Sequence, residues 1–146
     1  MSTNTASEAS PRKPSLVTEV PPAPSDVTLR HFQQRLSFET DCWDVHHAIA
    51  NDNKDFVLVD VRSPPLYAKG HVPTAINIPV GKIVASKLAE FQPALLVVVY
   101  CAGPHCNGAD RAAIRLASFG RPVKIMIGGI TGWLDEGFEL VPDEAK

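Results

Sequence analysis

Residues 94–121 read ALLVVVYCAGPHCNGADRAAIRLASFGR, a sequence that predicts a strand, a loop and a helix in consecutive order. The apolar, Val-rich run that ends at Tyr100 is typical of a strand buried on both faces of a parallel sheet. After Gly108, apolar residues at helical spacing predict a buried helix face made of Ala109, Ala112, Ala113, Leu116 and Ala117. Gly120 is placed to end this helix in the left-handed conformation.

The loop between this strand and this helix, residues 101–108, begins with Cys101. A residue directly after a parallel strand lies at the carboxyl edge of the sheet, where open α/β folds place their ligand sites. The following helix directs its unpaired N–H groups and the positive end of its dipole toward the same loop. We therefore expect a lowered pKa and a nucleophilic thiolate at Cys101, and a helix N-cap at Asn107.

A cysteine at the end of a strand is more often a small buried apolar residue than a nucleophile. The composition of the loop favours the nucleophile, because Gly103, Pro104 and Gly108 permit a tight path on which backbone N–H groups converge. From the residues alone, both interpretations stay open.

Length, charge and cysteine content restrict the class of protein. A chain of 146 residues allows one domain with a core. A formal net charge of -2, without a Lys/Arg cluster on a predicted helix face, disfavours nucleic acid as a partner. Cys42, Cys101 and Cys106 do not resemble a secreted disulfide framework. With neither a signal peptide pattern nor a membrane-spanning run, the sequence predicts a cytoplasmic protein that does not bind membranes.

Residues 1–25 are dominated by Ser, Thr, Pro, Ala and Glu, which is typical of a disordered tail. A proline-rich segment of this kind is also compatible with a partner-binding element. We expect the folded domain to span residues 26–142.

Apolar runs and helical periodicity alternate along the domain. They predict further strands over residues 36–39, 56–61, 75–78 and 123–127, and further helices over residues 25–35, 40–50, 82–91 and 130–136. Because strands alternate with helices, the sequence predicts an α/β fold with a mainly parallel sheet and helices on both faces.

Five stretches of the chain resemble the rhodanese domain, the family of single-domain sulfurtransferases. They are FVLVDVRS at 56–63, YAKGHVPTAINIP at 67–79, LVVVYC at 96–101, RAA at 111–113 and IMIGGITGWLDEGF at 125–138. The stretches occur in the order of the family, and the resemblance covers roughly residues 36–142. The resemblance implies the rhodanese-like fold.

The same resemblance places the family's catalytic cysteine at Cys101. Asp60 and Arg62 match the family's DVR and His71 its GH, which implies framework roles beside the active site. Two departures concern the site. The loop after Cys101 is longer than usual, which predicts a larger pocket, and Thr74 stands where the family commonly has Gly, which predicts an altered turn.

Cys106 has no counterpart in the ordinary loop of the family. It is compatible with three roles: a residue that resolves a persulfide or sulfenate on Cys101 as a disulfide, a passive loop residue, or the nucleophile itself. We rank Cys101 first as the catalytic residue and Cys106 second.

The resemblance implies transfer of sulfane sulfur through a Cys101 persulfide, without a cofactor or metal. The donor is a small anion such as thiosulfate, and the acceptor is cyanide, a thiol or a protein. The substrate-binding residues that we expect are Ala102, Gly103, Pro104, His105, Asn107, Gly108 and Arg111. The oligomeric state is left open.

Two other function classes remain. A cysteine-based phosphatase or arsenate reductase also holds an anion, but the phosphatase pattern Cys-x5-Arg fails, since Arg111 is one residue too close to Cys106. A non-catalytic rhodanese-like binding or regulatory module is the other alternative, and retention of Cys101 argues against it. A zinc site made of Cys101, His105 and Cys106 lacks a second ligand pair.

Overall fold

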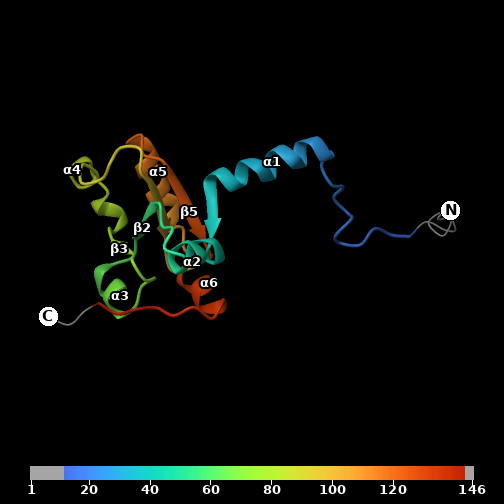
Figure 1. Cartoon of the computed structure of the whole chain (residues 1–146). Coiled ribbons are helices and arrows are strands. Elements are labelled where there is room, and N and C mark those ends of the chain that lie inside the picture. The colour runs from blue at the N-terminus through green and yellow to red at the C-terminus, as the bar shows by residue number, and fades with distance from the viewer. Residues whose placement is uncertain (1–11, 144–146) are drawn as a thin grey trace. The chain divides into compact units, whose positions relative to one another are not determined.

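The computed structural model describes residues 12–143, and the chain divides into two units, residues 1–33 and 34–146 (Figure 1). The elements follow in the order α1 (Ser25–Phe38), β1 (Glu39–Asp41), α2 (Cys42–Ala50), β2 (Phe56–Asp60), α3 (Pro64–Lys69), β3 (Ile76–Asn77), the 3-10 helix η2 (Val80–Lys82), α4 (Ala85–Leu88), β4 (Leu96–Tyr100), α5 (Gly108–Ser118), β5 (Val123–Ile127) and α6 (Gly129–Asp135). Of the predicted tail, residues 1–11 lie outside the described residues. Among the described residues, no helix combines the length and the apolar character needed to cross a bilayer.

All five strands belong to one parallel sheet with the order β1-β5-β4-β2-β3. The strand predicted from the Val-rich run is β4, which lies at the centre between β5 and β2. Its residues alternate between two cores: Val97 and Val99 belong to one, Val98 and Tyr100 to the other. The prediction of an α/β fold with a parallel sheet is confirmed.

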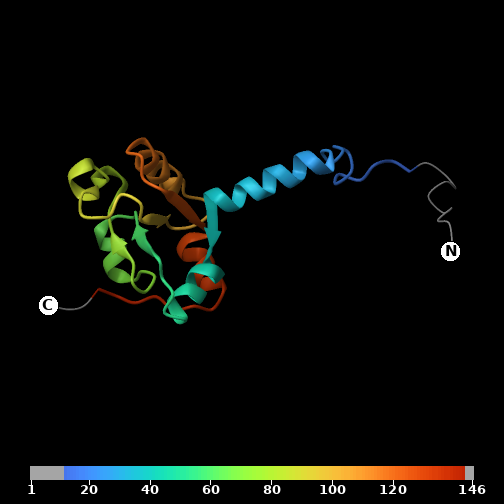
Figure 2. The ribbon, with the colours of Figure 1, turned by 45° about the horizontal axis from the view of Figure 1, so that its top comes forward.

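Each core is closed by its own set of helices. The core of Val97 and Val99 includes Leu88 from α4 and Ala112 and Leu116 from α5. The opposite core is closed by α2 and α6, which lie side by side in Figures 1 and 2. Helices on both faces of the sheet are thus confirmed, and the carboxyl ends of β2, β4 and β5 remain at one edge between the two layers.

Helix α5 follows most of the predicted pattern. Ala109, Ala112 and Leu116 are buried, whereas Ala117 is exposed. The helix ends as expected at Gly120, whose φ of +75° lies in the left-handed region. The N–H of Arg121 then donates to the carbonyl of Leu116 (3.0 Å), the bond that closes a glycine-terminated helix.

The predicted bounds of three elements are wrong. Helix α1 continues to Phe38, three residues beyond Arg35, and Arg35 pairs with Glu39 across its last turn (3.0 Å). The first strand is consequently Glu39–Asp41 rather than residues 36–39. Of residues 82–91, only Ala85–Leu88 form an α-helix, α4, and Lys82 ends the 3-10 helix η2. The two are separate because the carbonyl of Ile83 accepts two hydrogen bonds from the guanidinium of Arg115 instead of a helical N–H.

Candidate active site

Cys101 directly follows β4 and is 8% exposed. The peptide groups around it are fixed to the start of α6. The carbonyl of Cys101 accepts from the N–H of Ile130 (3.1 Å), and the carbonyl of Ala102 accepts from both the N–H (3.0 Å) and the hydroxyl (3.1 Å) of Thr131. Sequence reasoning did not single out Ile130 or Thr131 as anchors of the loop. The glycine pair that precedes them, at the carboxyl end of the neighbouring strand, is the signal that could have found them.

Gly129 is the position where α6 comes closest to the Cys101 loop. A side chain at Gly129 would overlap the carbonyl oxygen of Cys101 and come within 2.9 Å of the backbone nitrogen of Gly103. The φ of Gly129, +56°, is also one that most side chains disfavour. Glycine is therefore required here both for space and for backbone conformation.

We predict that Gly129→Ala lowers the free energy of unfolding by about 2 kcal/mol, because the backbone of the loop must move and the left-handed residue is strained. Urea denaturation measures this change. Gly81→Ala is the matched control, since a side chain at Gly81 would meet no atom within 4 Å. Equal stability of the two variants would contradict the close approach.

The loop brings Cys106 back onto Cys101. The N–H of Cys106 donates to the carbonyl of Gly103 (3.0 Å), which closes a tight turn. As a result the two Sγ atoms lie 2.7 Å apart, and neither cysteine is in a disulfide. Gly108 makes room for the pair, because a Cβ there would lie 2.7 Å from the sulfur of Cys101.

The predicted lowering of the Cys101 pKa is wrong. Burial and the hydrogen bond to Cys106 raise the pKa of Cys101 to about 11. The lowered pKa belongs to Cys106, whose thiolate accepts from the Cys101 thiol and from the backbone N–H of Gly108. The N-terminal end of α5 thus stabilises a negative charge as expected, but on the more exposed sulfur of the pair.

Asn107 is not a side-chain cap of α5. Its φ of −90° and ψ of 13° depart from the extended conformation of a capping residue, and no hydrogen bond joins its side chain to the start of the helix. Instead its Oδ1 accepts from Nε of Arg111 (3.2 Å). His105, Asn107 and Arg111 are exposed.

An open cavity of about 520 Å³ lies beside the two cysteines. Of the predicted site residues, it is lined by Cys101, Gly103, Pro104 and Cys106. His105 and Asn107, with Ala102, line a second open cavity, which shares Pro104 and Cys106 with the first. Gly108 packs against the sulfur pair, whereas Arg111 lines neither cavity.

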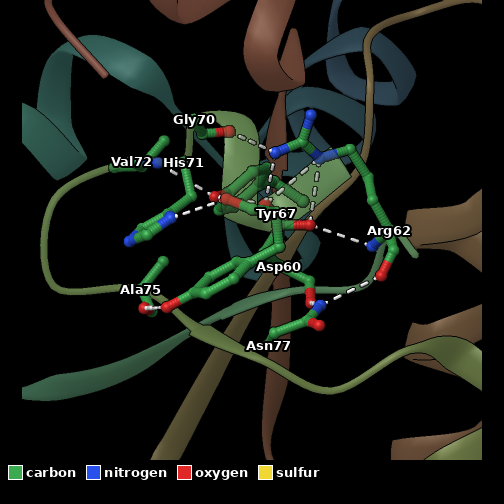
Figure 3. A network of polar contacts seen from close by, with 9 residues as sticks. Asp60, Arg62, Tyr67, Gly70, His71, Val72, Ala75 and Asn77 are labelled. Carbon is green, nitrogen blue, oxygen red and sulfur yellow. Dashed lines mark hydrogen bonds and ion pairs between the residues drawn. The ribbon is translucent and has the colours of Figure 1, made fainter. Parts of the chain in front are cut away.

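A buried polar network joins the ends of β2 and β4 to the turn around His71 (Figure 3). Asp60, at the end of β2, is fully buried and binds Nε and the terminal nitrogen of Arg62 through both of its oxygens (2.8 to 3.1 Å). It also accepts from the hydroxyl of Tyr100 (2.7 Å), which in turn accepts from the N–H of Val72 (3.0 Å). Since Tyr100 directly precedes Cys101, the network fixes the end of the strand that carries the cysteine.

The turn around His71 belongs to the same network. Arg62 donates to the carbonyl of Gly70 (2.6 Å), and Nδ1 of His71 contacts the carbonyl of Tyr67 at 2.9 Å (Figure 3). The rings of Tyr67 and His71 are stacked, with centroids 3.7 Å apart. Thr74 adopts a φ of +73°, the left-handed conformation that suits the glycine it replaces. These contacts make Asp60, Arg62 and His71 framework residues in the geometry of the fold.

Cys42, the third cysteine, follows β1 and is buried. Its thiol contacts the carbonyl oxygens of Ile127 (3.5 Å) and Gly129 (3.6 Å). Burial, with the charges of Asp41 and Glu136, raises the pKa of Cys42 to about 11. Cys42 is therefore a neutral thiol that joins α2 to the end of β5.

Comparison with known proteins supports the same fold and identifies the family. The chain is 38% identical over 89 residues to an HTH-type transcriptional regulator, Rv0324, of Mycobacterium tuberculosis. The aligned residues cover 57% of this chain but only 39% of that protein. It is 29% identical over 93 residues to a sulfurtransferase of Allochromatium vinosum, covering 64% of this chain and 85% of the relative.

Among solved structures, the BH2092 protein of Bacillus halodurans has a TM-score of 0.79 and 37% sequence identity. This similarity covers 82% of this chain and 87% of that one. The family model of the rhodanese-like domain matches residues 44–136, which include strands β2 to β5 and the complete cysteine loop. The chain belongs to the rhodanese-like domain family.

Proposed function

We propose that this chain is a sulfurtransferase that moves sulfane sulfur from a small anionic donor such as thiosulfate to cyanide or a thiol through a persulfide on Cys101. The observation that carries the proposal is the pair of sulfur atoms, 2.7 Å apart, beside an open cavity at the carboxyl edge of the sheet. Relationship to a sulfurtransferase of Allochromatium vinosum supports it.

In the first step, the sulfur of Cys101 attacks the outer sulfur of thiosulfate. The Cys101 proton moves to the Cys106 thiolate, with which it already forms a hydrogen bond. The sulfur–sulfur bond of thiosulfate breaks, and sulfite leaves with the electron pair. The raised pKa of Cys101 is compatible with this step, because Cys106 removes the proton as the new bond forms.

Backbone N–H groups of the loop bind the anionic end of the donor. Within residues 12–143, the N–H group of Gly103, which lines the cavity beside the two cysteines, has no hydrogen-bond acceptor and is available to an anion there. The N–H groups of His105 and Asn107 also have no acceptor, but these residues line the second cavity. Arg111 adds a positive charge one turn into α5 and favours approach of the donor. In the second step, cyanide or a thiol, free or on a protein, attacks the terminal sulfur of the persulfide and regenerates Cys101.

A regulatory module is the second candidate, and one observation favours it: the similarity to a transcriptional regulator of Mycobacterium tuberculosis. The match covers 39% of that protein, so most of the regulator lies outside the region that is similar to this chain. Such a module would bind a partner without turning over a sulfur donor.

Release of sulfite separates the two candidates. Reduced protein mixed with thiosulfate, in the absence of an acceptor, is expected to release about one equivalent of sulfite per chain, since one Cys101 accepts one sulfur. Sulfite is quantified by rapid mixing and chemical detection. Sulfite below a tenth of an equivalent, with both thiols of the pair reduced, would contradict the sulfurtransferase and leave the regulatory module.

A further inference from the structure

The geometry of the two cysteines favours a disulfide between them in addition to a persulfide on Cys101. Their sulfur atoms are 2.7 Å apart, and a disulfide bond is about 2.05 Å long, so the two atoms need to approach by less than about 1 Å. The turn between the carbonyl of Gly103 and the N–H of Cys106 already holds the loop closed (3.0 Å). An intramolecular disulfide is therefore sterically close to the reduced state.

The start of α5 packs closely against the two sulfur atoms. Gly108 at the start of α5 packs against both sulfur atoms, and a Cβ there would lie 2.7 Å from Cys101 and 3.5 Å from Cys106. Ala109, the next residue, is buried and belongs to the same core as Cys101. A side chain larger than glycine at position 108 would force the sulfur atoms out of this arrangement.

The two sulfur atoms differ in exposure and in pKa, and both differences favour Cys106 as the attacking sulfur of a resolving reaction. Cys101 is 8% exposed, whereas Cys106 is half-buried and borders both cavities. The lowered pKa of Cys106 makes it the thiolate of the pair, and burial keeps Cys101 a thiol. Once Cys101 carries the persulfide, its thiol no longer donates to Cys106, but the backbone N–H of Gly108 still favours the Cys106 thiolate. The more exposed sulfur, which can ionise, is thus adjacent to the sulfur on which the persulfide is proposed to form.

We propose that Cys106 is a resolving cysteine, which attacks the Cys101 persulfide and makes the protein a sulfide-releasing persulfide reductase toward small sulfane-sulfur donors. The inference rests on the proposed function, because it requires the Cys101 persulfide. Neither a third thiol nor a metal takes part. Cys42 is neutral and engaged with the carbonyl oxygens of Ile127 and Gly129.

The reaction balances without a further reactant. The sulfur of Cys106 forms a bond with Sγ of Cys101, the bond between Sγ and the terminal sulfur breaks, and the terminal sulfur leaves as hydrosulfide with the electron pair. The Cys106 proton gained in the first step leaves on the hydrosulfide. The product is a Cys101–Cys106 disulfide, which a dithiol reductant must reduce to two thiols before the next cycle.

The test is a single turnover without reductant. Reduced wild-type protein and Cys106→Ser are mixed anaerobically with one equivalent of thiosulfate, and hydrosulfide is quantified by alkylation with a bimane reagent. The protein is then alkylated and digested with trypsin, which leaves both cysteines on residues 88–111 and Cys42 on residues 36–54. A disulfide lowers the mass of the first peptide by about 2 Da and blocks its alkylation.

We expect wild-type protein to release about one equivalent of hydrosulfide and to lose both alkylation sites on residues 88–111, while Cys42 stays reduced. Cys106→Ser is expected to release at least tenfold less hydrosulfide and to retain the extra sulfur. A wild-type protein that retains its persulfide with Cys106 free would overturn the resolving role and leave the sulfurtransferase intact. Absence of added sulfur in Cys106→Ser, with no sulfite released, would instead overturn the sulfurtransferase itself.

Discussion

Cys101→Ser is expected to reduce transfer of sulfur from thiosulfate to cyanide at least about 1000-fold, because it removes the atom that carries the sulfur. The hydroxyl of serine is of similar size and is not a nucleophile toward sulfane sulfur at neutral pH. Formation of thiocyanate, followed colorimetrically, measures the loss. The thermal midpoint of the variant should stay within a few degrees of the wild type, since a small side chain with a hydroxyl still fits the site.

Cys106→Ser provides the comparison for this experiment. It keeps Cys101 and removes the neighbouring thiolate that accepts its proton. With cyanide in large excess, so that it takes the terminal sulfur before Cys106 attacks the persulfide, we expect slower but measurable formation of thiocyanate, because solvent can accept the proton. If Cys101→Ser retained activity and Cys106→Ser lost it, Cys106 would be the nucleophile and the order in which we rank the two cysteines would be reversed.

Asp60→Asn is expected to lower the free energy of unfolding by about 3 to 5 kcal/mol, the cost of breaking a buried ion pair on one side. Asp60 is fully buried and Arg62 nearly so, with side-chain exposures of 0% and 9%. An asparagine of nearly the same shape leaves the guanidinium without its anion and accepts fewer hydrogen bonds from Arg62 and Tyr100.

Urea denaturation measures this effect, and Asp55→Asn is the matched control. Asp55 is exposed in the turn before β2, so that its replacement should change the free energy of unfolding by less than about 0.5 kcal/mol. Similar unfolding midpoints for the two variants would show that the network around Asp60 does not stabilise the fold.

The fold could be predicted from the sequence because the apolar residues follow the pattern of a buried strand in one segment and the spacing of a helix in the next. The Val-rich run ending at Tyr100 predicts a buried strand, the spacing from Ala109 to Leu116 predicts a helix, and both are found. The bounds of a helix could not be predicted where a residue distant in the sequence donates to a carbonyl that a helical N–H would otherwise bind. Arg115 takes the carbonyl of Ile83 and shortens a predicted helix, a contact that no local pattern indicates.

The candidate site shows the same division. The position of Cys101 at the carboxyl edge of the sheet follows from chain order alone. Its electrostatics do not, because they depend on burial and on the 2.7 Å contact with Cys106. The dipole of a helix start suggests a thiolate near α5, but only the folded loop determines which of the two sulfur atoms receives the charge.

The most direct test of the account is the intact mass of Cys106→Ser and Cys101→Ser after incubation with thiosulfate. Blocking resolution should trap the carrier, so that Cys106→Ser is predicted to gain one sulfur, about 32 Da, and to lose it again on addition of cyanide. Cys101→Ser is predicted to gain nothing. A sulfur that appears on Cys101→Ser, or on neither variant, would contradict the claim that Cys101 carries the transferred sulfur.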